Sequence, residues 1–356
     1  MADPAACAAS GRDPERPPRP FWPVEHQPVL GKRDGAMARL EAATYVGVLA
    51  LLARLPRAAA EAFGAAVTPL AKRLDRGHAD AARTYLRQAL VEHGGQDLSD
   101  AQLERLVGQA YRHLFRVALD AERYDRRFGR AENRDALLAR TDVHLSERAR
   151  AVTECMAAEP GDPTPEHWPA GLVPGRGCVL VSGHCGDWEM AARLASAAGF
   201  RPLYVISKPP KNLPLSRVFQ ERREESGLRL LPRRGAMQFA ARVVDGGGAL
   251  GMLLDQRAKK KPVFAPLFGR RARCDRSAGV LLKRLRCPVV FVAAYRTGDL
   301  RWRFEAPSVI LPGDLAGSSA EATASLVNEH LERLLLAEPE QVFWLHDRYR
   351  GGDLES

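Results

Sequence analysis

Hydrophobic residues follow two different rhythms in two parts of the chain. Between residues 36 and about 150, runs rich in Ala and Leu alternate with charged residues at helical spacing, as in AQLERLVGQAYRHLFRVALDAERY. The apolar positions of that run fall on one stripe: Leu103, Leu106, Val107, Ala110, Leu114 and Val117. Because residues three and four apart share one face of an α-helix, the pattern predicts a helical region with a buried face.

From about residue 175, short apolar runs replace this spacing. GCVLVSG, ALGMLL and PVVFVAAY are apolar almost throughout, which is typical of strands buried on both faces of a sheet. They alternate with helical stretches such as 277–286 and 320–337. We therefore expect an α/β core over residues 151–356, with a mixed, mostly parallel central sheet flanked by helices, after a helical, membrane-associating region over 36–150.

The first residues differ from both parts in composition. Residues 1–35 are rich in Pro and Arg and show no hydrophobic period, which predicts a disordered tail. They also lack the apolar core of a secretory signal. The six cysteines are scattered without a CxxC pair, which favours free thiols in a reducing compartment. These features predict a protein that works on the cytoplasmic side.

One early segment bears on membrane attachment. Residues 42–53, AATYVGVLALLA, carry no charge but number only 12, whereas a spanning helix needs about 20. Arg39 and Arg54 flank the segment. Two interpretations stay open: packing on the protein core, or lying in the membrane interface, which suits an Ala/Leu-rich helix between arginines.

Positive charge is concentrated in one part of the chain. The formal net charge is +10, yet residues 201–300 contain 22 Lys and Arg against 7 Asp and Glu. Such a block points to an anionic partner, although a solvated arginine-rich surface is the alternative. A nucleic-acid binder would interleave aromatic residues with the basic ones, and KKKPVFAPLFGRRAR offers only Phe264 and Phe268. We therefore expect a membrane surface or a phosphorylated substrate, and no nucleic acid.

Candidate chemistry lies where the strand GCVLVSG turns into a helix. There LVSGHCGDWEMAARLA, residues 180–195, places His184 and Glu189 five positions apart. The strand should carry His184 to the carboxyl edge of the sheet, where open α/β folds place their sites, and Asp187 is the predicted N-cap of the helix. Glu189 could hydrogen-bond one imidazole nitrogen and leave the other to accept a proton, as in a general base. The alternative is a histidine that only helps to cap the helix.

A cysteine beside the histidine offers a second chemistry. Cys185 precedes a helix N-terminus, which lowers the pKa of a thiol, and the turn is similar to a nucleophile elbow. That motif would need a glycine where Asp187 stands, so the sequence favours the histidine.

Several blocks, in a fixed order, resemble one family. SGHCGDWE resembles the HX4D/E motif of the lysophospholipid acyltransferase superfamily, and more closely that of the bacterial lipid A biosynthesis late acyltransferases, the lauroyl and myristoyl transferases. The later blocks that resemble this family are residues 201–227, residues 231–256 ending in Asp-Gln, VFAPLFGR, CPVVFVAAYR and the closing EPEQVFWLHDRYR. Together they cover roughly residues 170–350.

The resemblance implies a role for each matched residue. His184 would be the general base, with Glu189 as its orienting partner, and would deprotonate an acceptor hydroxyl that attacks the thioester of an acyl carrier protein or coenzyme A. Other matched residues would bind the acceptor or shape the floor of the site: Asn212, Arg223, Arg234, Asp255 and Gln256. Arg234 as a surface arginine and Asp255 as a strand cap are the alternatives. The implied reaction uses no metal and no cofactor besides the acyl thioester.

The resemblance also implies a location and an acceptor. The enzyme would be peripheral or shallowly anchored at the cytoplasmic face of the cell inner membrane, where it would acylate a lipid A precursor. The closing block departs from the family pattern, because Val342 and Phe343 replace Trp and Leu and Asp347 replaces a basic residue. Lysophospholipids and other glycolipids therefore stay open as acceptors. A thioesterase with the same base and an inactive lipid-binding relative are the other open functions.

Overall fold

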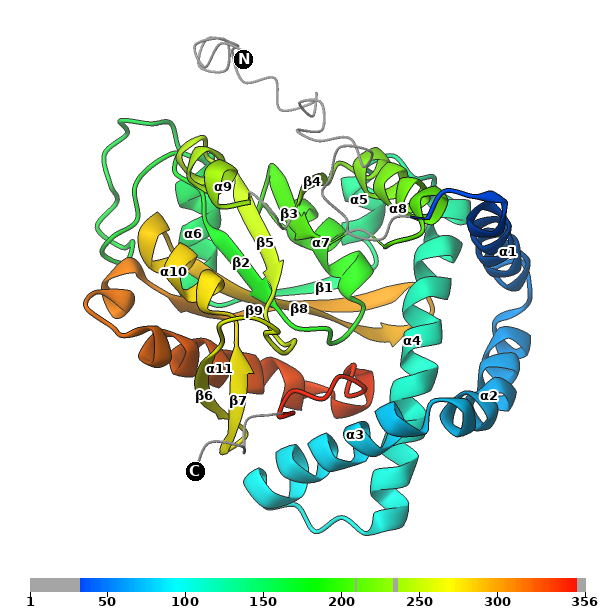
Figure 1. Ribbon diagram of the computed structural model, residues 1–356. Helices are drawn as coiled ribbons and strands as arrows, with labels where there is room; N and C mark the ends of the chain where they lie inside the picture. Colours follow the sequence, from blue (N-terminus) through cyan, green and yellow to red (C-terminus); the bar gives the residue numbers. More distant parts are fainter. Residues whose placement is uncertain (1–32, 209, 233–235, 351–356) are drawn as a thin grey trace.

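The computed structural model describes residues 33–208, 210–232 and 236–350, so almost all of the tail predicted over residues 1–35 lies outside the described residues. A central sheet is covered by helices, and the helices of the N-terminal region gather along one side of it (Figure 1). The predicted fold class, an α/β core with a mixed, mostly parallel sheet after a helical region, is confirmed.

The N-terminal region is helical, as its spacing predicts. It consists of α1 (Ala36–Leu52), α2 (Arg57–Leu74), α3 (Arg76–Leu86), the π-helix η3 (Arg87–His93) and α4 (Asp100–Phe128). The predicted stripe on α4 is buried at Leu103, Val107, Ala110 and Val117. A capping box starts α4, in which Ser99 and Gln102 each accept a backbone hydrogen bond from the other. Since α1, α2 and α3 pack on α4, and α4 packs on α7, α4 joins the region to the core.

Seven strands form the central sheet, in the order β1-β9-β8-β2-β5-β3-β4. They are β1 (Thr141–Leu145), β2 (Val179–Ser182), β3 (Leu203–Ser207), β4 (Arg229–Pro232), β5 (Ala249–Leu253), β8 (Val289–Gly298) and β9 (Arg301–Ile310). Strands β2, β3, β4, β5 and β8 are parallel, β9 is antiparallel to β8, and β1 is parallel to β9. The three apolar runs predicted as buried strands are β2, β5 and β8. Strands β6 (Val263–Leu267) and β7 (Arg270–Cys274) form a separate antiparallel hairpin.

Helices cover both faces of the sheet. One layer contains α9 (Ala236–Asp245), α10 (Arg276–Leu285) and α11 (Ala320–Ala337), and the other contains α5 (Arg134–Leu138), α6 (Glu147–Ala157) and α7 (Trp188–Ala197). Val179 and Val181 of β2 pack with the first layer, whereas Leu180 packs with the second. The remaining helices are α8 (Leu213–Glu225), η4 (Pro312–Leu315) and η5 (Pro339–Gln341). Burial of β2 on both faces agrees with its continuous apolar sequence.

The sheet begins earlier in the chain than the boundary at residue 151 that the sequence indicates. Strand β1 lies within the stretch assigned to the helical region, and α6 crosses the boundary. The physical reason is that β1 is a short edge strand, TDVHL, with its three central residues exposed. An edge strand of this kind carries little apolar signal in the sequence.

Candidate active site

The pairing of two parallel strands brings His184 and Asp255 to the same edge of the sheet. β2 and β5 are in register at Ser182 and Leu253, so His184 and Asp255 each lie two residues beyond that pair. A Cβ added at Gly183 would lie 3.3 Å from the Cβ of Asp255. The glycine therefore lets the two segments approach closely.

Asp255 binds His184 through both of its carboxylate oxygens. The imidazole Nδ1 lies 2.8 Å from Oδ1, and the backbone N–H of His184 donates to Oδ2 at 2.9 Å. Because a carboxylate only accepts, Nδ1 carries the proton and Nε2 is left as the proton acceptor. The side-chain Nε2 of Gln256 lies 3.5 Å from Nε2 of His184. Both residues of the predicted Asp-Gln pair thus reach the imidazole.

The contact with Asp255 corrects one prediction. Glu189 was expected to hydrogen-bond the imidazole, but its carboxylate accepts from Arg223 instead, at 2.6 Å (Nη2 to Oε1) and 3.2 Å (Nε to Oε2). The five-residue spacing brings Glu189 into the same site as His184. Strand pairing across the sheet, which the spacing does not reveal, places Asp255 at Nδ1.

The charges of the site act on one another in a consistent way. Burial disfavours a charged imidazole, but the Asp255 carboxylate outweighs burial and raises the pKa of His184, and Glu189 adds a smaller contribution. Burial would raise the pKa of each carboxyl group, yet pairing with His184 lowers the pKa of Asp255 and pairing with Arg223 lowers that of Glu189. His184 is therefore a stronger base than a free imidazole, beside two ionised carboxylates.

Cys185 is enclosed in the core, away from any substrate. Its side chain is fully buried, and burial, together with the nearby Asp255 carboxylate, raises the pKa of the thiol to about 12. A nucleophilic cysteine needs access and a lowered pKa, so that alternative is contradicted. Asp187 is confirmed as the N-cap of α7, where its side chain accepts from the backbone N–H of Met190.

The C-terminal segment of residues 341–348 braces the turn that carries His184. The N–H of Gly186 donates to the carbonyl of Gln341 at 2.7 Å, and the N–H of Phe343 donates to the carbonyl of His184 at 2.8 Å. The ring of Phe343 also lies 5.9 Å from the imidazole, between centroids. Although Phe343 departs from the family pattern, it thus forms one wall of the site.

The same segment braces the loop that carries Asp255. His346 accepts a hydrogen bond from the backbone N–H of Arg257 at 3.0 Å, and the guanidinium of Arg348 donates to the carbonyl of Gln256. Sequence reasoning gave His346 and Arg348 no role. The sequence signal that could have identified them is their position in the closing block, because this block contacts both the His184 turn and the Asp255 loop.

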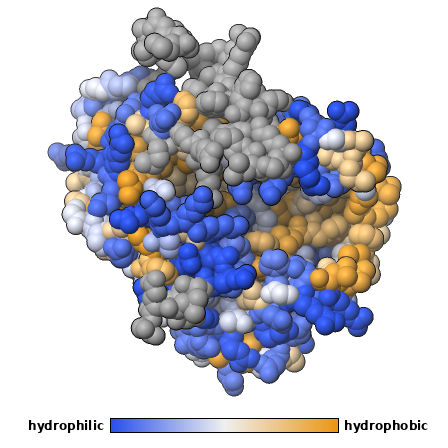
Figure 2. Space-filling model, viewed as in Figure 1, coloured by the Kyte–Doolittle hydropathy of each residue, from blue (hydrophilic) through white to orange (hydrophobic). Residues whose placement is uncertain are grey.

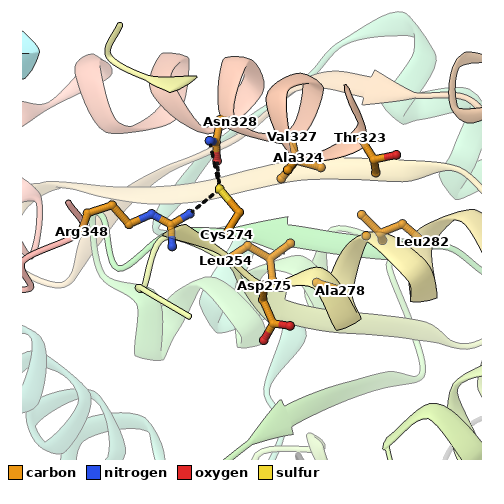
Figure 3. A pocket seen from close by; sticks show the side chains of 11 residues that line it. Leu254, Cys274, Asp275, Ala278, Leu282, Thr323, Ala324, Val327, Asn328 and Arg348 are labelled. Atoms are coloured by element: carbon orange, nitrogen blue, oxygen red, sulfur yellow. Dashed lines mark hydrogen bonds between the residues drawn. The ribbon is translucent and has the colours of Figure 1, made fainter. Parts of the chain in front are cut away.

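A small cavity lies between α10 and α11, lined in part by Leu254 and Arg348 next to the Asp255 loop (Figure 3). Its volume is about 20 Å³, which is room for about one water molecule. In Figure 3, Arg348 and Asn328 both point toward the Sγ of Cys274, to which each has a hydrogen bond. A cavity of this size does not admit an acyl chain, so this side of the site is packed core.

The side chain of Asn212, which is predicted to bind the acceptor, makes structural contacts. Its side-chain Oδ1 caps α8 by accepting from the N–H of Leu215, and its side-chain Nδ2 donates to the carbonyl of Ala38 and the carboxylate of Glu41 on α1, at 2.9 and 3.0 Å. This buried side chain fastens α1 to α8. It stands about 16 Å along α8 from Arg223, at 1.5 Å per residue, so the structure does not bring it together with the other predicted residues, and its role in acceptor binding stays a prediction.

Part of the basic block is neutralised internally. Arg223 pairs with Glu189, and the neighbouring Arg222 pairs with Glu122 of α4 at 2.7 Å. Arg234 lies outside the described residues. Over residues 33–208, 210–232 and 236–350, no three or more His, Cys, Asp or Glu side chains are grouped so that they could hold a metal ion.

An exposed apolar surface adjoins the site along α1 and α2, and it continues inward to a hollowed part of the protein (Figure 2). Its members are Met37, Leu40, Val48, Leu51, Phe63, Val67, Leu70 and Leu74. Tyr45 of α1 connects it to the site, because its ring meets that of Phe219 edge-on at 5.7 Å and Arg223 lies over the same Phe219. Among the described helices, none is long and apolar enough to cross a membrane.

Comparison with known proteins identifies the family. A family model described as bacterial lipid A biosynthesis acyltransferase matches residues 164–351, which is more than half of the chain and includes His184, Arg223 and Asp255. A search of curated proteins gives no match. The matched span begins before β2 and ends with the closing block, so it contains every contact of the site described above except those of α1 and α4. The chain therefore belongs to the bacterial lipid A biosynthesis acyltransferase family and is an acyltransferase of lipid A synthesis.

Proposed function

We propose that the enzyme transfers a fatty acyl chain from an acyl thioester to a hydroxyl of a lipid A precursor, with His184 as general base and Asp255 as the residue that orients it. The observation that carries the proposal is the pair of hydrogen bonds from His184 to Asp255. This pair fixes the imidazole tautomer, and the free Nε2 is the acceptor that a hydroxyl nucleophile needs.

The proposed reaction is a direct transfer. Nε2 of His184 takes the hydroxyl proton as the acceptor oxygen attacks the thioester carbonyl carbon. The tetrahedral intermediate then collapses, the C–S bond breaks, and the imidazolium returns the proton to the leaving thiolate. Asp255 stabilises the imidazolium between these steps. No enzyme group is acylated, so the buried Cys185 takes no part, and no cofactor is consumed besides the acyl thioester.

Glu189 and Arg223 serve the acceptor side in this proposal. A guanidinium has five N–H donors, of which Glu189 accepts from two and the hydroxyl of Ser207 from one at 3.4 Å. Donors remain for an anionic headgroup, and the ion pair with Glu189 holds the arginine in one orientation. Glu189 also adds negative charge near His184, which favours the imidazolium.

The proposed location is the cytoplasmic face of the inner membrane, with the apolar surface of α1 and α2 resting on or shallowly inserted in the lipid. Eight exposed large apolar side chains on two adjacent helices support this location, because such patches are rare on soluble monomers. Each fully buried Leu or Phe contributes about 1.5–3 kcal/mol. The net charge of +10 also suits an anionic leaflet. An acceptor lipid could then reach His184 without leaving the membrane.

The acyl donor is an acyl carrier protein or acyl-coenzyme A, and both present the same thioester to His184. Purified enzyme supplied with each donor in turn, with a lipid A precursor in detergent, distinguishes them by initial rate. Mass spectrometry of the products then tests the function. The proposal expects an acceptor heavier by one acyl group. Free fatty acid without acylated acceptor would instead indicate a thioesterase, and neither product would indicate a lipid-binding protein.

A second arm tests the acceptor in cells. Lipid extracts from cells with and without the gene should differ in a lipid A species by the mass of one acyl chain. A difference confined to lysophospholipids or other glycolipids would contradict the proposed acceptor while leaving acyl transfer intact.

A further inference from the structure

A histidine of the helical region reaches the turn that carries His184. His113 lies in the middle of α4, is 2% exposed, and its Nε2 lies 2.8 Å from the carbonyl oxygen of Gly186. A carbonyl can only accept, so Nε2 carries the hydrogen. Burial, reinforced by the positive charges of Arg116 and Arg296, lowers the pKa of His113 to about 4. The side chain is therefore neutral at physiological pH and acts as a fixed donor.

Three hydrogen bonds fix the N–H and the carbonyl of Gly186 and the N–H of Asp187, at the end of the His184 turn, which we define as residues 183–187. The N–H of Gly186 donates to the carbonyl of Gln341, and the N–H of Asp187 donates to the carbonyl of Ala294 at 2.6 Å. Gly186 has φ +56°, and a Cβ there would lie 2.1 Å from the oxygen of Ala294. The turn is thus pressed against β8 on one side. The third contact, from His113, is the only one of the three that a side chain makes.

One aromatic ring, that of Trp188, lies between the imidazoles of His113 and His184. The ring of Trp188 meets His113 edge-on at 5.8 Å and meets His184 edge-on at 5.5 Å, between centroids. A displacement of His113 would therefore be transmitted to His184 by two routes, the Gly186 carbonyl and the Trp188 ring.

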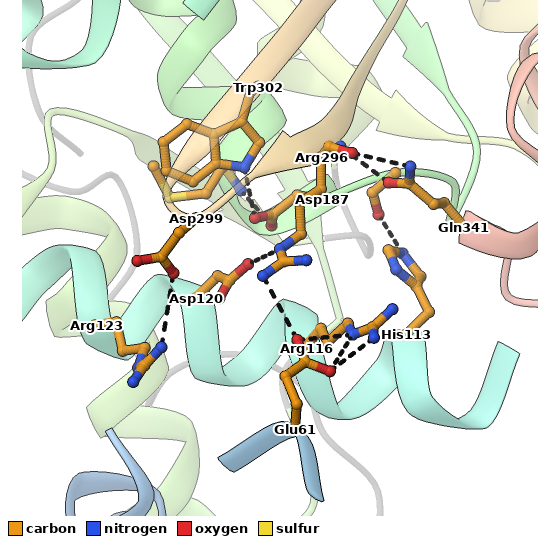
Figure 4. Close-up of polar contacts among 12 residues, drawn as sticks. Glu61, His113, Arg116, Asp120, Arg123, Asp187, Arg296, Asp299, Trp302 and Gln341 are labelled. Atoms are coloured by element: carbon orange, nitrogen blue, oxygen red, sulfur yellow. Dashed lines mark hydrogen bonds and ion pairs between the residues drawn. The ribbon is translucent and has the colours of Figure 1, made fainter. Parts of the chain in front are cut away.

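The contact between Gln341 and the turn is also connected to α4, through Arg296 and Asp120 (Figure 4). The side chain of Gln341 bonds both the N–H and the carbonyl of Arg296, at 2.9 and 3.1 Å. The guanidinium of Arg296 pairs in turn with Asp120 of α4 and with Glu61 of α2. Helix α4 thus supports two of the three contacts, one directly through His113 and one through Asp120.

We propose that His113 is a positioning residue for acyl transfer, whose hydrogen bond to Gly186 holds the His184 turn so that the imidazole meets Asp255. This inference rests on the proposed function, in which His184 is the base. The two residues that orient the base then come from opposite sides, Asp255 from the sheet and His113 from α4. A base displaced by about 1 Å can lose about 100-fold in rate.

Three substitutions separate the hydrogen bond from the shape of the side chain. In His113→Gln, the amide nitrogen is three bonds from Cβ, as Nε2 is in histidine, so the donor is retained. His113→Phe keeps an aromatic ring against Trp188 but has no donor. His113→Asn places its donor one bond too short. His144→Phe, on the exposed edge strand β1, is the matched control.

Two readouts on the full-length protein test the proposal, with thermal unfolding to identify folded variants. We expect His113→Phe to lower kcat about 10-fold to 100-fold with KM changed less than about threefold, and to speed amide hydrogen exchange at Gly186 and Asp187. His113→Gln should restore both values to within about threefold of wild type. If the Phe variant does not fold, His113→Asn takes its place with the same expectation. His144→Phe should change neither value.

The remaining outcomes overturn the proposal. Unchanged kcat in the Phe and Asn variants would show that the hydrogen bond does not position the base, whether or not exchange changes. Equal damage in the Gln variant would show that shape matters and the donor does not. Hydrogen exchange needs no substrate, so it tests the hydrogen bond to Gly186 even if the proposed function fails, in which case the wild type would transfer no acyl group. Faster exchange in His113→Phe would then still support the hold of His113 on the turn. Unchanged exchange would refute it.

Discussion

Two carboxylates lie beside His184, and they belong to different regions of the molecule. Asp255 follows β5 at the edge of the sheet, its side chain is 7% exposed, and it binds the imidazole directly. Glu189 stands in the first turn of α7, its side chain is 32% exposed, and it binds Arg223 of α8. The first faces the packed core, and the second faces the apolar surface of α1 and α2 through Arg223 and Phe219. The difference suggests a division of work between orienting the base and holding the acceptor.

The largest effect is expected from the removal of His184, beside which both carboxylates lie. His184→Ala should lower kcat about 10⁴-fold, the upper end of what a general base contributes, in an assay with saturating donor and acceptor. Cys185→Ala is the control and should keep most of the activity, because its thiol is buried. Near-normal turnover by His184→Ala would show that His184 is not the general base.

The next largest effect is expected at Asp255, the carboxylate that faces the packed core. Asp255→Asn should lower kcat about 10³-fold, because an amide can donate to Nδ1 and so stabilise the tautomer whose Nε2 cannot accept a proton. The fold should be retained, since the shape is unchanged, and circular dichroism checks this. A loss below tenfold would mean that Asp255 only caps its strand.

The acceptor side should respond differently. Arg223→Ala should lower kcat/KM for a phosphorylated acceptor about tenfold to 100-fold, since a charge-assisted hydrogen bond contributes about 1.5–3 kcal/mol. Arg223→Lys should recover only part of the lost kcat/KM, because an ammonium cannot form the bidentate hydrogen bonds of a guanidinium. Lys259→Ala and Lys260→Ala, at exposed positions, are the matched controls. Equal, small effects of all four changes would leave Arg223 without a role in binding.

The smallest effect concerns the apolar surface beyond Arg223. Leu51→Glu and Leu74→Glu should each weaken binding to anionic vesicles about tenfold, from the lost burial of one apolar side chain, as measured by co-sedimentation. Activity on acceptor dispersed in detergent should hardly change. Val173→Glu, an exposed valine away from α1 and α2, is the control. If it weakened binding equally, the apolar surface would not be the membrane contact.

Local patterns predicted the elements around the site but not its decisive contact. The apolar runs and the helical spacing predicted β2, the turn, α7 and the Asp187 cap, because each depends on residues close in sequence. Asp255 lies 71 positions from His184, and only the β2–β5 pairing shows that they meet. The Asp-Gln pair was singled out by resemblance, yet nothing local indicated that it binds the imidazole.

Two further residues show the same limit of sequence reasoning. Asn212 was predicted to bind the acceptor, but its amide is taken by α1, whose place beside α8 is a tertiary feature. His113 was not singled out, because on the sequence it is one polar residue within an amphipathic helix. Its contact with Gly186 depends on how α4 packs against α7 and η5.

The pH dependence of kcat/KM tests the division of work between the two carboxylates most directly. His184 must be neutral to accept a proton, so activity falls as the pH drops through its pKa, which Asp255 raises more than Glu189 does. Removing a negative charge lowers that pKa and moves the acidic limb to lower pH. We predict a larger shift of the acidic limb, and a larger loss of kcat, in Asp255→Asn than in Glu189→Gln. A larger shift and loss in Glu189→Gln would contradict it.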